Sequence, residues 1–159
     1  DGCVVSYIHG GGRIGVLVKA ETAVVNDAVK EALTNVAMQV AALAPKYVSS
    51  EDVSEEYKEH EKAILLAQAK NENPDKPENI IEKMIIGRLN KELKEVCLME
   101  QAYVKAEDGK QTVAKYLQQV SKEVGADIKI TGFVRFETGE GLEKKNEDFA
   151  AEVAAQMNA

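Results

Sequence analysis

The chain has 159 residues, enough for one domain with a sizeable core, and its 45% hydrophobic and 30% charged residues are ordinary for a soluble protein. Its net charge of −7 argues against a nucleic-acid backbone as the main partner, because phosphate binding needs a concentrated basic face. No apolar run approaches the roughly 20 residues of a membrane span, and no signal-peptide pattern is present. We therefore expect a cytoplasmic protein with no membrane partner.

The first predicted element is a β-hairpin over residues 4–20, in which two apolar, β-branched runs flank three glycines at 10–12. Consecutive glycines supply the positive φ angles that a tight turn needs. A third strand is predicted over residues 128–137, where apolar residues alternate with polar ones and form one buried face: Ile128, Ile130, Val134 and Phe136. Together these segments predict a three-stranded antiparallel sheet that closes over a long insertion.

A helix is predicted over residues 24–43, capped by Asn26 or Thr22 and ended by Pro45. Apolar residues recur every three or four positions, so one side should cover the sheet, with Gln39 on the opposite, polar side. Residues 97–105 are predicted to be extended or irregular. A short helix over 112–123, closed by Gly125, and an amphipathic C-terminal helix over 146–157 complete the prediction.

Residues 49–95 are highly charged and carry only a narrow apolar stripe at near-heptad spacing. Ser50 is the predicted cap of a first helix, a polar turn over 71–77 breaks it, and residues 75–78 resemble a capping box for a second helix. Two such helices predict an antiparallel coiled-coil hairpin that stands away from the body, in preference to two helices lying flat on it.

The predicted fold class is α+β: a three-stranded antiparallel sheet covered by helices, with an inserted antiparallel coiled-coil hairpin and a C-terminal helix. The predicted domains are a discontinuous core of residues 1–48 plus 96–142, the hairpin at 49–95, and a C-terminal helical module at 143–159.

The chemical signals favour a binding module over an enzyme. The glycine-rich run at 10–15 formally matches G-x-G-x-x-G, but a strand-like segment follows it where a dinucleotide site needs a helix. Neither His9 nor His60 has a second ligand at metal-binding spacing, so we expect no metal and no cofactor. His9 lies beside the glycine turn, near Arg13, and is well placed to touch a macromolecule. Cys3 and Cys97 are predicted to be reduced thiols, with a disulfide between them as the lesser alternative.

Four segments, in the same order along the chain, resemble bacterial elongation factor Ts: Ser-Tyr-Ile-His at 6–9 with Gly-Arg-Ile-Gly-Val-Leu-Val at 12–18, Ile-Glu-Lys-Met at 81–84 with Gly-Arg at 87–88, Thr-Gly-Phe-Val-Arg-Phe-Glu at 131–137 with Gly-Glu-Gly at 139–141, and Phe-Ala-Ala-Glu-Val-Ala at 149–154. The resemblance covers the whole chain and implies the C-terminal half of the factor: one core subdomain, an inserted coiled coil and a C-terminal module. The chain begins with Asp1 and not Met, as a fragment or processed product does.

The resemblance implies a guanine-nucleotide exchange factor that binds elongation factor Tu, both GDP-bound and nucleotide-free, and promotes GDP release in translation. The sheet would meet the third domain of that partner, and the C-terminal helix its nucleotide domain. The implied partner-binding residues are His9, Arg13, Val104 and Lys105 on the sheet side, and Phe149, Val153 and Met157 on the C-terminal helix. Val104-Lys105 departs from the apolar pair expected there.

The family's Thr-Asp-Phe-Val segment, which approaches the magnesium site of elongation factor Tu, is not in this sequence. We therefore expect weak binding and weak acceleration of GDP release by the chain alone. An alternative is a structural module that forms a homodimer through its coiled-coil hairpin or its sheet. A third hypothesis is an enzyme that binds a nucleotide at residues 10–15. For Phe149 and Val153, docking of the helix onto its own body is the simpler alternative.

Overall fold

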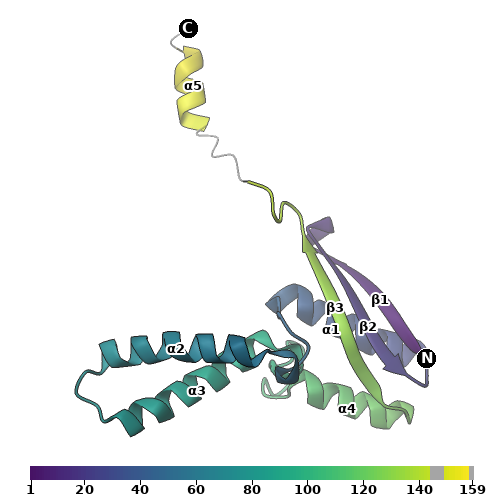
Figure 1. The fold of residues 1–159 in the computed structure, drawn as a ribbon. Coiled ribbons are helices and arrows are strands. Elements are labelled where there is room, and N and C mark those ends of the chain that lie inside the picture. The colour runs from purple at the N-terminus through teal and green to yellow at the C-terminus, as the bar shows by residue number, and fades with distance from the viewer. Residues whose placement is uncertain (144–148, 158–159) are drawn as a thin grey trace.

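A three-stranded antiparallel sheet organises the chain (Figure 1). The computed structural model describes residues 1–143 and 149–157, apart from the side chains of residues 149, 151 and 152. The strands are β1 (Gly2–His9), β2 (Ile14–Thr22) and β3 (Ile128–Glu137), in the order β1-β2-β3. The predicted α+β class and the predicted bounds of the third strand are confirmed.

A β-bulge interrupts the pairing of β2 with β3. Ala20 pairs with Ile130, but the neighbouring Lys19 pairs with Gly132, which leaves Thr131 as the extra residue. The Thr131 hydroxyl donates to the carbonyl oxygen of Lys19 at 3.3 Å. One extra residue shifts the alternation of side chains by one position. Before the bulge the even-numbered residues of β3 face the helices, and after it the odd-numbered residues do.

This phase change exposes apolar side chains that the sequence pattern placed in the core. Before the bulge, Ile128 and Ile130 are buried, as predicted. Beyond it Phe133 packs against the core, whereas Val134 and Phe136 are 46% and 59% exposed. The predicted common face is therefore wrong for Val134 and Phe136, because the alternation of residue types along one strand does not reveal a bulge.

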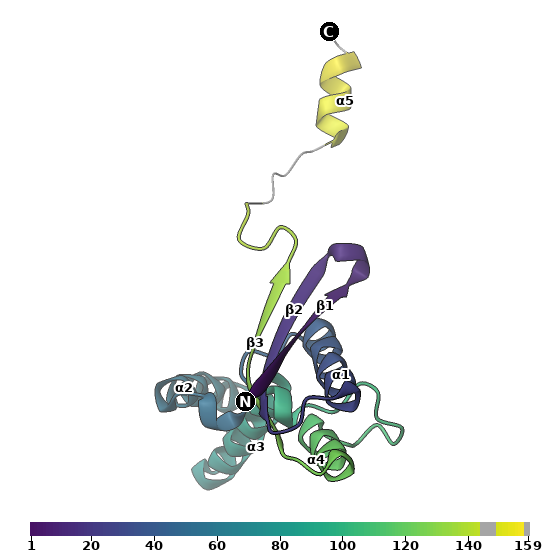
Figure 2. The ribbon, with the colours of Figure 1, turned by 90° about the vertical axis from the view of Figure 1, so that its right-hand side faces the viewer.

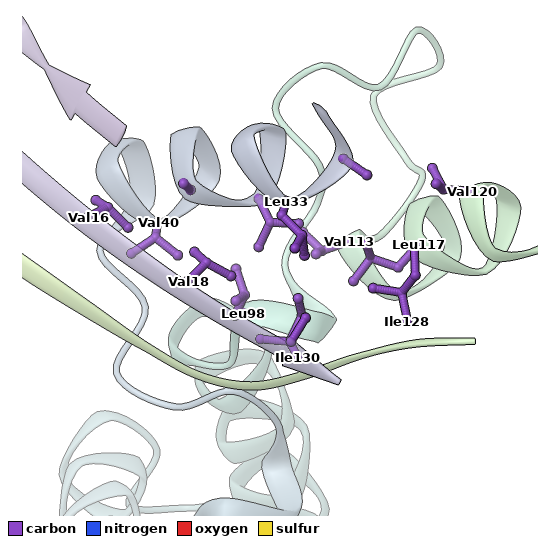
Figure 3. Close-up of a cluster of buried hydrophobic side chains, with 14 of the residues drawn as sticks. Val16, Val18, Leu33, Val40, Leu98, Val113, Leu117, Val120, Ile128 and Ile130 are labelled. Atoms are coloured by element: carbon purple, nitrogen blue, oxygen red, sulfur yellow. The ribbon is translucent and has the colours of Figure 1, made fainter. Parts of the chain in front are cut away.

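Helices α1 (Asp27–Leu43) and α4 (Val113–Val124) bury their apolar sides in the main core with the sheet (Figure 3). α1 begins three residues later than predicted, after Asn26, whose side-chain oxygen accepts the Val29 backbone N–H at 2.9 Å. The other predicted cap, Thr22, is buried in β2. The core joins side chains of the sheet and of both helices: Val16, Val18, Leu33, Val40, Val113, Leu117 and Ile130.

The side chain of Gln39, predicted to face solvent, is fully buried. Its Nε2 donates to the Ala102 carbonyl oxygen at 3.0 Å and to Gln101 Oε1 at 3.2 Å, and its Oε1 accepts the Val104 backbone N–H at 2.9 Å. Gln101 Nε2 in turn donates to the Glu95 carbonyl oxygen at 2.7 Å. These hydrogen bonds compensate the burial of two amides and tie the segment that follows the hairpin to α1.

Helices α2 (Glu55–Glu72) and α3 (Glu78–Val96) form the predicted antiparallel hairpin and extend away from the sheet (Figures 1 and 2). Ser50, predicted as the cap of α2, lies instead in a 3₁₀ turn, η2 (Ser50–Asp52). α2 begins after Ser54, whose hydroxyl oxygen accepts a first-turn backbone N–H at 3.2 Å. Pro77 occupies the N-cap position of α3, so the predicted capping box at 75–78 is wrong.

Two apolar clusters lie along the hairpin seam, one near the body and one near the tip. Val53, Leu93 and Cys97 are buried at the base, and a second cluster of Ala69, Ile81 and Ile85 lies toward the tip. Beside the base cluster, between Leu89 and Leu93, burial and then the nearby Glu61 carboxylate raise the pKa of the Glu92 carboxyl. The ionised form of Glu92 is therefore disfavoured in the packed hairpin.

The C-terminal helix α5 spans Phe149–Met157, and Figure 1 draws it apart from the sheet. Residues 146–148 of the predicted helix lie outside the described residues. A helix of membrane-spanning length and hydropathy is not found among residues 1–143 and 149–157. The division of the chain into the three predicted domains stays a prediction.

The substitution Gln39→Ala tests the buried amide network. It leaves the Val104 N–H and the Ala102 carbonyl without their partner, so we expect the free energy of unfolding to fall by about 1–3 kcal/mol. Gln118→Ala, on the exposed side of α4, is the matched control and should change it by less than about 0.5 kcal/mol. Urea unfolding followed by circular dichroism measures both, and equal values for the two variants would contradict the prediction.

Candidate protein-binding surface

The turn between β1 and β2 forms one end of the sheet, here called the turn end and defined by residues 9–14 and 135–140 (Figure 2). All three glycines have positive φ angles, 60°, 66° and 97°, as the sequence predicted. His9 is exposed before the turn, and its Nδ1 lies 2.9 Å from the Tyr7 hydroxyl. The turn therefore presents His9 on a defined backbone with a fixed neighbour.

Arg13 follows the glycines and is fixed by the end of β3. Its carbonyl oxygen accepts the Thr138 backbone N–H at 2.9 Å and the Thr138 hydroxyl at 3.1 Å. Its guanidinium extends toward Glu137, with Nε 3.9 Å from Oε1. The backbone of Arg13 is thus held by β3, while its side chain remains largely exposed.

The face of the sheet opposite α1, here called the open face, carries exposed apolar side chains from all three strands. The register places Ile8 beside Gly15 and Gly15 beside Phe136, and in the next row Leu17 lies between Ser6 and Val134. The exposed large apolar residues of this face are Val4, Ile8, Leu17, Val134 and Phe136. Clustered exposed apolar side chains are typical of an interaction surface.

Val104 and Lys105 lie on the loop between η3 (Leu98–Glu100) and α4. The buried Gln39 amide holds the Val104 backbone, which leaves the Val104 side chain exposed. Lys105 Nζ donates to Asn35 Oδ1 at 2.7 Å, and Asn35 Nδ2 donates to the Tyr116 hydroxyl at 2.9 Å. This pair is therefore positioned by α1 and α4.

Beneath this loop, the rings of Tyr103 and Tyr116 stack with centroids 4.3 Å apart. Burial, followed by the neighbouring Tyr116, raises the pKa of the Tyr103 hydroxyl. Tyr103 therefore stays neutral at physiological pH and acts as a packing residue under the loop.

The predicted binding residues lie on three separate elements. His9 and Arg13 share the turn end, Val104 and Lys105 share the loop, and no hydrogen bond or ion pair among residues 1–143 joins the two pairs. On α5, Val153 and Met157 are exposed, and the Phe149 side chain lies outside the described residues. Sequence reasoning missed the open face, because the exposure of Val134 and Phe136 depends on the bulge at Thr131.

The glycine-rich turn lacks the geometry of a dinucleotide site. The G-x-G-x-x-G match at 10–15 is a turn that leads into β2, so it lacks the helix N-terminus that holds a pyrophosphate. Groups of three or more potential metal ligands are not found in the described part of the chain. Cys3 and Cys97 are free, and burial raises the pKa of the Cys97 thiol to about 11, which keeps it protonated.

Comparison with known proteins assigns the family. The profile of the family described as "Elongation factor TS" matches residues 1–140. The chain belongs to the elongation factor Ts family. It is 55% identical over 157 residues to elongation factor Ts of Clostridioides difficile (strain 630), and 53% identical over 157 residues to that of Clostridium botulinum (strain ATCC 19397). These alignments cover 99% of this chain and 50% of each relative, so the chain spans about half the length of these elongation factor Ts proteins.

The substitution Gly11→Ala tests whether the turn end depends on a left-handed residue. Gly11 has φ 66° and ψ 29°, and an added Cβ would meet open space, so any cost comes from the backbone alone. We expect the free energy of unfolding to fall by about 1–2 kcal/mol. Gly11→Asn, whose side chain tolerates this conformation, should cost less. Urea unfolding measures both, and a loss for Gly11→Asn that equals or exceeds the loss for Gly11→Ala would contradict the prediction.

Proposed function

We propose that this chain is the part of a guanine-nucleotide exchange factor that binds elongation factor Tu in the cytoplasm and promotes GDP release. The observation that carries the proposal is the family match over residues 1–140. The chain itself breaks no bond in this function. It acts by differential affinity, binding the nucleotide-free partner more tightly than the GDP-bound partner.

The proposed contacts use the surfaces described above. The turn end, with His9 and Arg13, and the loop with Val104 and Lys105 would meet the third domain of elongation factor Tu. Two features support this assignment: both pairs have exposed side chains, and both are held by hydrogen bonds to regular elements, so little ordering is needed on binding. Val153, Met157 and Phe149 of α5 would meet the nucleotide domain.

A fluorescent-GDP release assay tests the proposal. The chain is added to Clostridioides difficile elongation factor Tu loaded with a fluorescent GDP analogue, in excess unlabelled GDP. We expect release to accelerate with chain concentration, but to reach a lower rate than with the whole elongation factor Ts of that organism, since the Thr-Asp-Phe-Val segment is not in this sequence.

The two histidines of the chain provide the matched variants for this assay. His9→Ala should raise the concentration needed for half-maximal acceleration about fivefold, as expected for the loss of one central contact. His60→Ala, exposed on α2, should leave it unchanged. Release that does not respond to the chain at any concentration would overturn the proposed function.

A second candidate, self-assembly into a homodimer, is favoured by the open face. Burying its five exposed apolar side chains against a second copy would remove them from water without rearranging the sheet. Such a dimer and the complex with elongation factor Tu are not mutually exclusive.

Sedimentation velocity over a range of concentrations measures the oligomeric state. If the open face pairs two copies, Phe136→Ser should shift the equilibrium toward monomer, because it removes an exposed aromatic ring from that face. Ile86→Ser, an exposed apolar residue on α3, is the matched control for pairing through the hairpin. A concentration-independent monomer would exclude the dimer, and sensitivity to Ile86→Ser alone would assign it to the hairpin.

A further inference from the structure

Two of the three arginines in the chain converge on one carboxylate at the turn end. Arg135 Nη2 lies 3.0 Å from Glu137 Oε2, and Arg13 Nε lies 3.9 Å from Glu137 Oε1. The third arginine, Arg88, pairs with Glu72 in the hairpin at 2.7 Å. The turn end therefore concentrates a residue type that is rare in this sequence, where lysine supplies nearly all other positive charge.

Both arginines at the turn end keep unused hydrogen-bond donors. A guanidinium has five N–H groups, and the Arg135 Nε is buried without a hydrogen-bond partner among the described residues. This buried Nε is closed to an incoming group, so a partner would meet the Nη groups of Arg135, whose side chain is 20% exposed. The Arg13 side chain is 74% exposed, and its 3.9 Å contact with Glu137 is too loose to hold it strongly.

Glu137 is the carboxylate that the two guanidiniums share. The Glu140 carboxylate is also near, and its Oε2 accepts the Glu137 backbone N–H at 3.3 Å. The neighbouring Thr138 N–H points to β2, where it donates to the Arg13 carbonyl oxygen, so the Glu137 N–H points to the free edge of β3. Glu140 therefore lies at the edge of the sheet and not on the face that carries the two arginines.

We propose that Arg13 and Arg135 bind a carboxylate of the protein partner, an Asp or Glu side chain that enters at the turn end on the face covered by α1. The planar guanidinium fork matches a carboxylate in two-point contact, which a lysine cannot do. The net charge of −7 disfavours a nucleic-acid phosphate as the ligand. This inference rests on the proposed function, because it names the chemical group that the binding surface recognises.

Calorimetric titration of the chain into nucleotide-free Clostridioides difficile elongation factor Tu tests the proposal. Arg13→Ala and Arg135→Ala should each weaken binding about fivefold or more. Glu137→Gln should tighten it about twofold or more, because it removes the carboxylate that competes for both guanidiniums. Arg88→Ala, which removes the remaining arginine and its ion pair, should stay within about twofold of the unmodified chain.

The arginine substitutions and Glu137→Gln are expected to change the affinity in opposite directions, and this separates a binding role from a structural one. If the arginines only brace the end of β3, Glu137→Gln will weaken binding together with Arg135→Ala, and the inference is overturned. Circular dichroism checks that each variant folds. If Arg135→Ala does not, Arg135→Lys, which keeps the charge but loses the fork, replaces it and should still weaken binding.

Two further outcomes would also decide the matter. Unchanged binding by both the Arg13 and the Arg135 variants would overturn the carboxylate site while leaving the proposed function intact. Displacement of elongation factor Tu by a short single-stranded RNA would assign the arginines to phosphate instead. A chain that fails to bind elongation factor Tu at all would overturn the proposed function itself, and this inference with it.

Discussion

The hydrogen-bonded pairing of β2 with β3 joins the two ends of the described body, with Ile14 opposite Glu137 and Thr22 opposite Ile128. The β1–β2 hairpin alone would be marginal in water, and the third strand completes a sheet that can support α1 and α4. Closing a long loop costs more entropy than closing a short one, but this cost grows only with the logarithm of the loop length. The insertion between the strands can therefore hold two helices of the body and a complete helical hairpin at an added entropic cost of roughly 2–3 kcal/mol over a short turn.

Periodicity predicted what depends on local sequence. The bounds of β3, the apolar side of α1 and the existence of the hairpin all follow from residue spacing, and the structure confirms them. The failures depend on contacts between distant segments. Thr131 becomes a bulge residue because of its relation to Lys19 on β2, which the sequence of β3 does not contain. Gln39 is polar by type, and its burial is compensated only because the loop after the hairpin supplies three hydrogen-bonding groups.

The candidate surface likewise contains some residues whose placement could be predicted from the sequence and others whose placement could not. The position of His9 and Arg13 beside a turn could be predicted from three glycines between two strands, and Val104 and Lys105 came from family resemblance. The convergence of Arg13 and Arg135 on Glu137 could not be predicted, since it requires both the β2–β3 register and the phase set by the bulge. Without the extra residue at 131, Arg135 would point to the open face and Phe136 to the helices. One inserted residue thus creates both the arginine pair and the apolar open face.

The hairpin is coupled to this platform through a few specific contacts. Its base is anchored by the buried cluster of Val53, Leu93 and Cys97 and by the hydrogen bond from Gln101 to the Glu95 carbonyl, and Gln101 is itself bonded to Gln39 of α1. Glu92 lies beside this anchor, between Leu93 and Leu89, which packs against the same cluster. Because burial and the nearby Glu61 raise the pKa of the Glu92 carboxyl in the folded state, its protonation as the pH falls through that pKa favours the packed hairpin. The hairpin is therefore anchored to the body at its base, and its outer half is held together by the separate tip cluster of Ala69, Ile81 and Ile85.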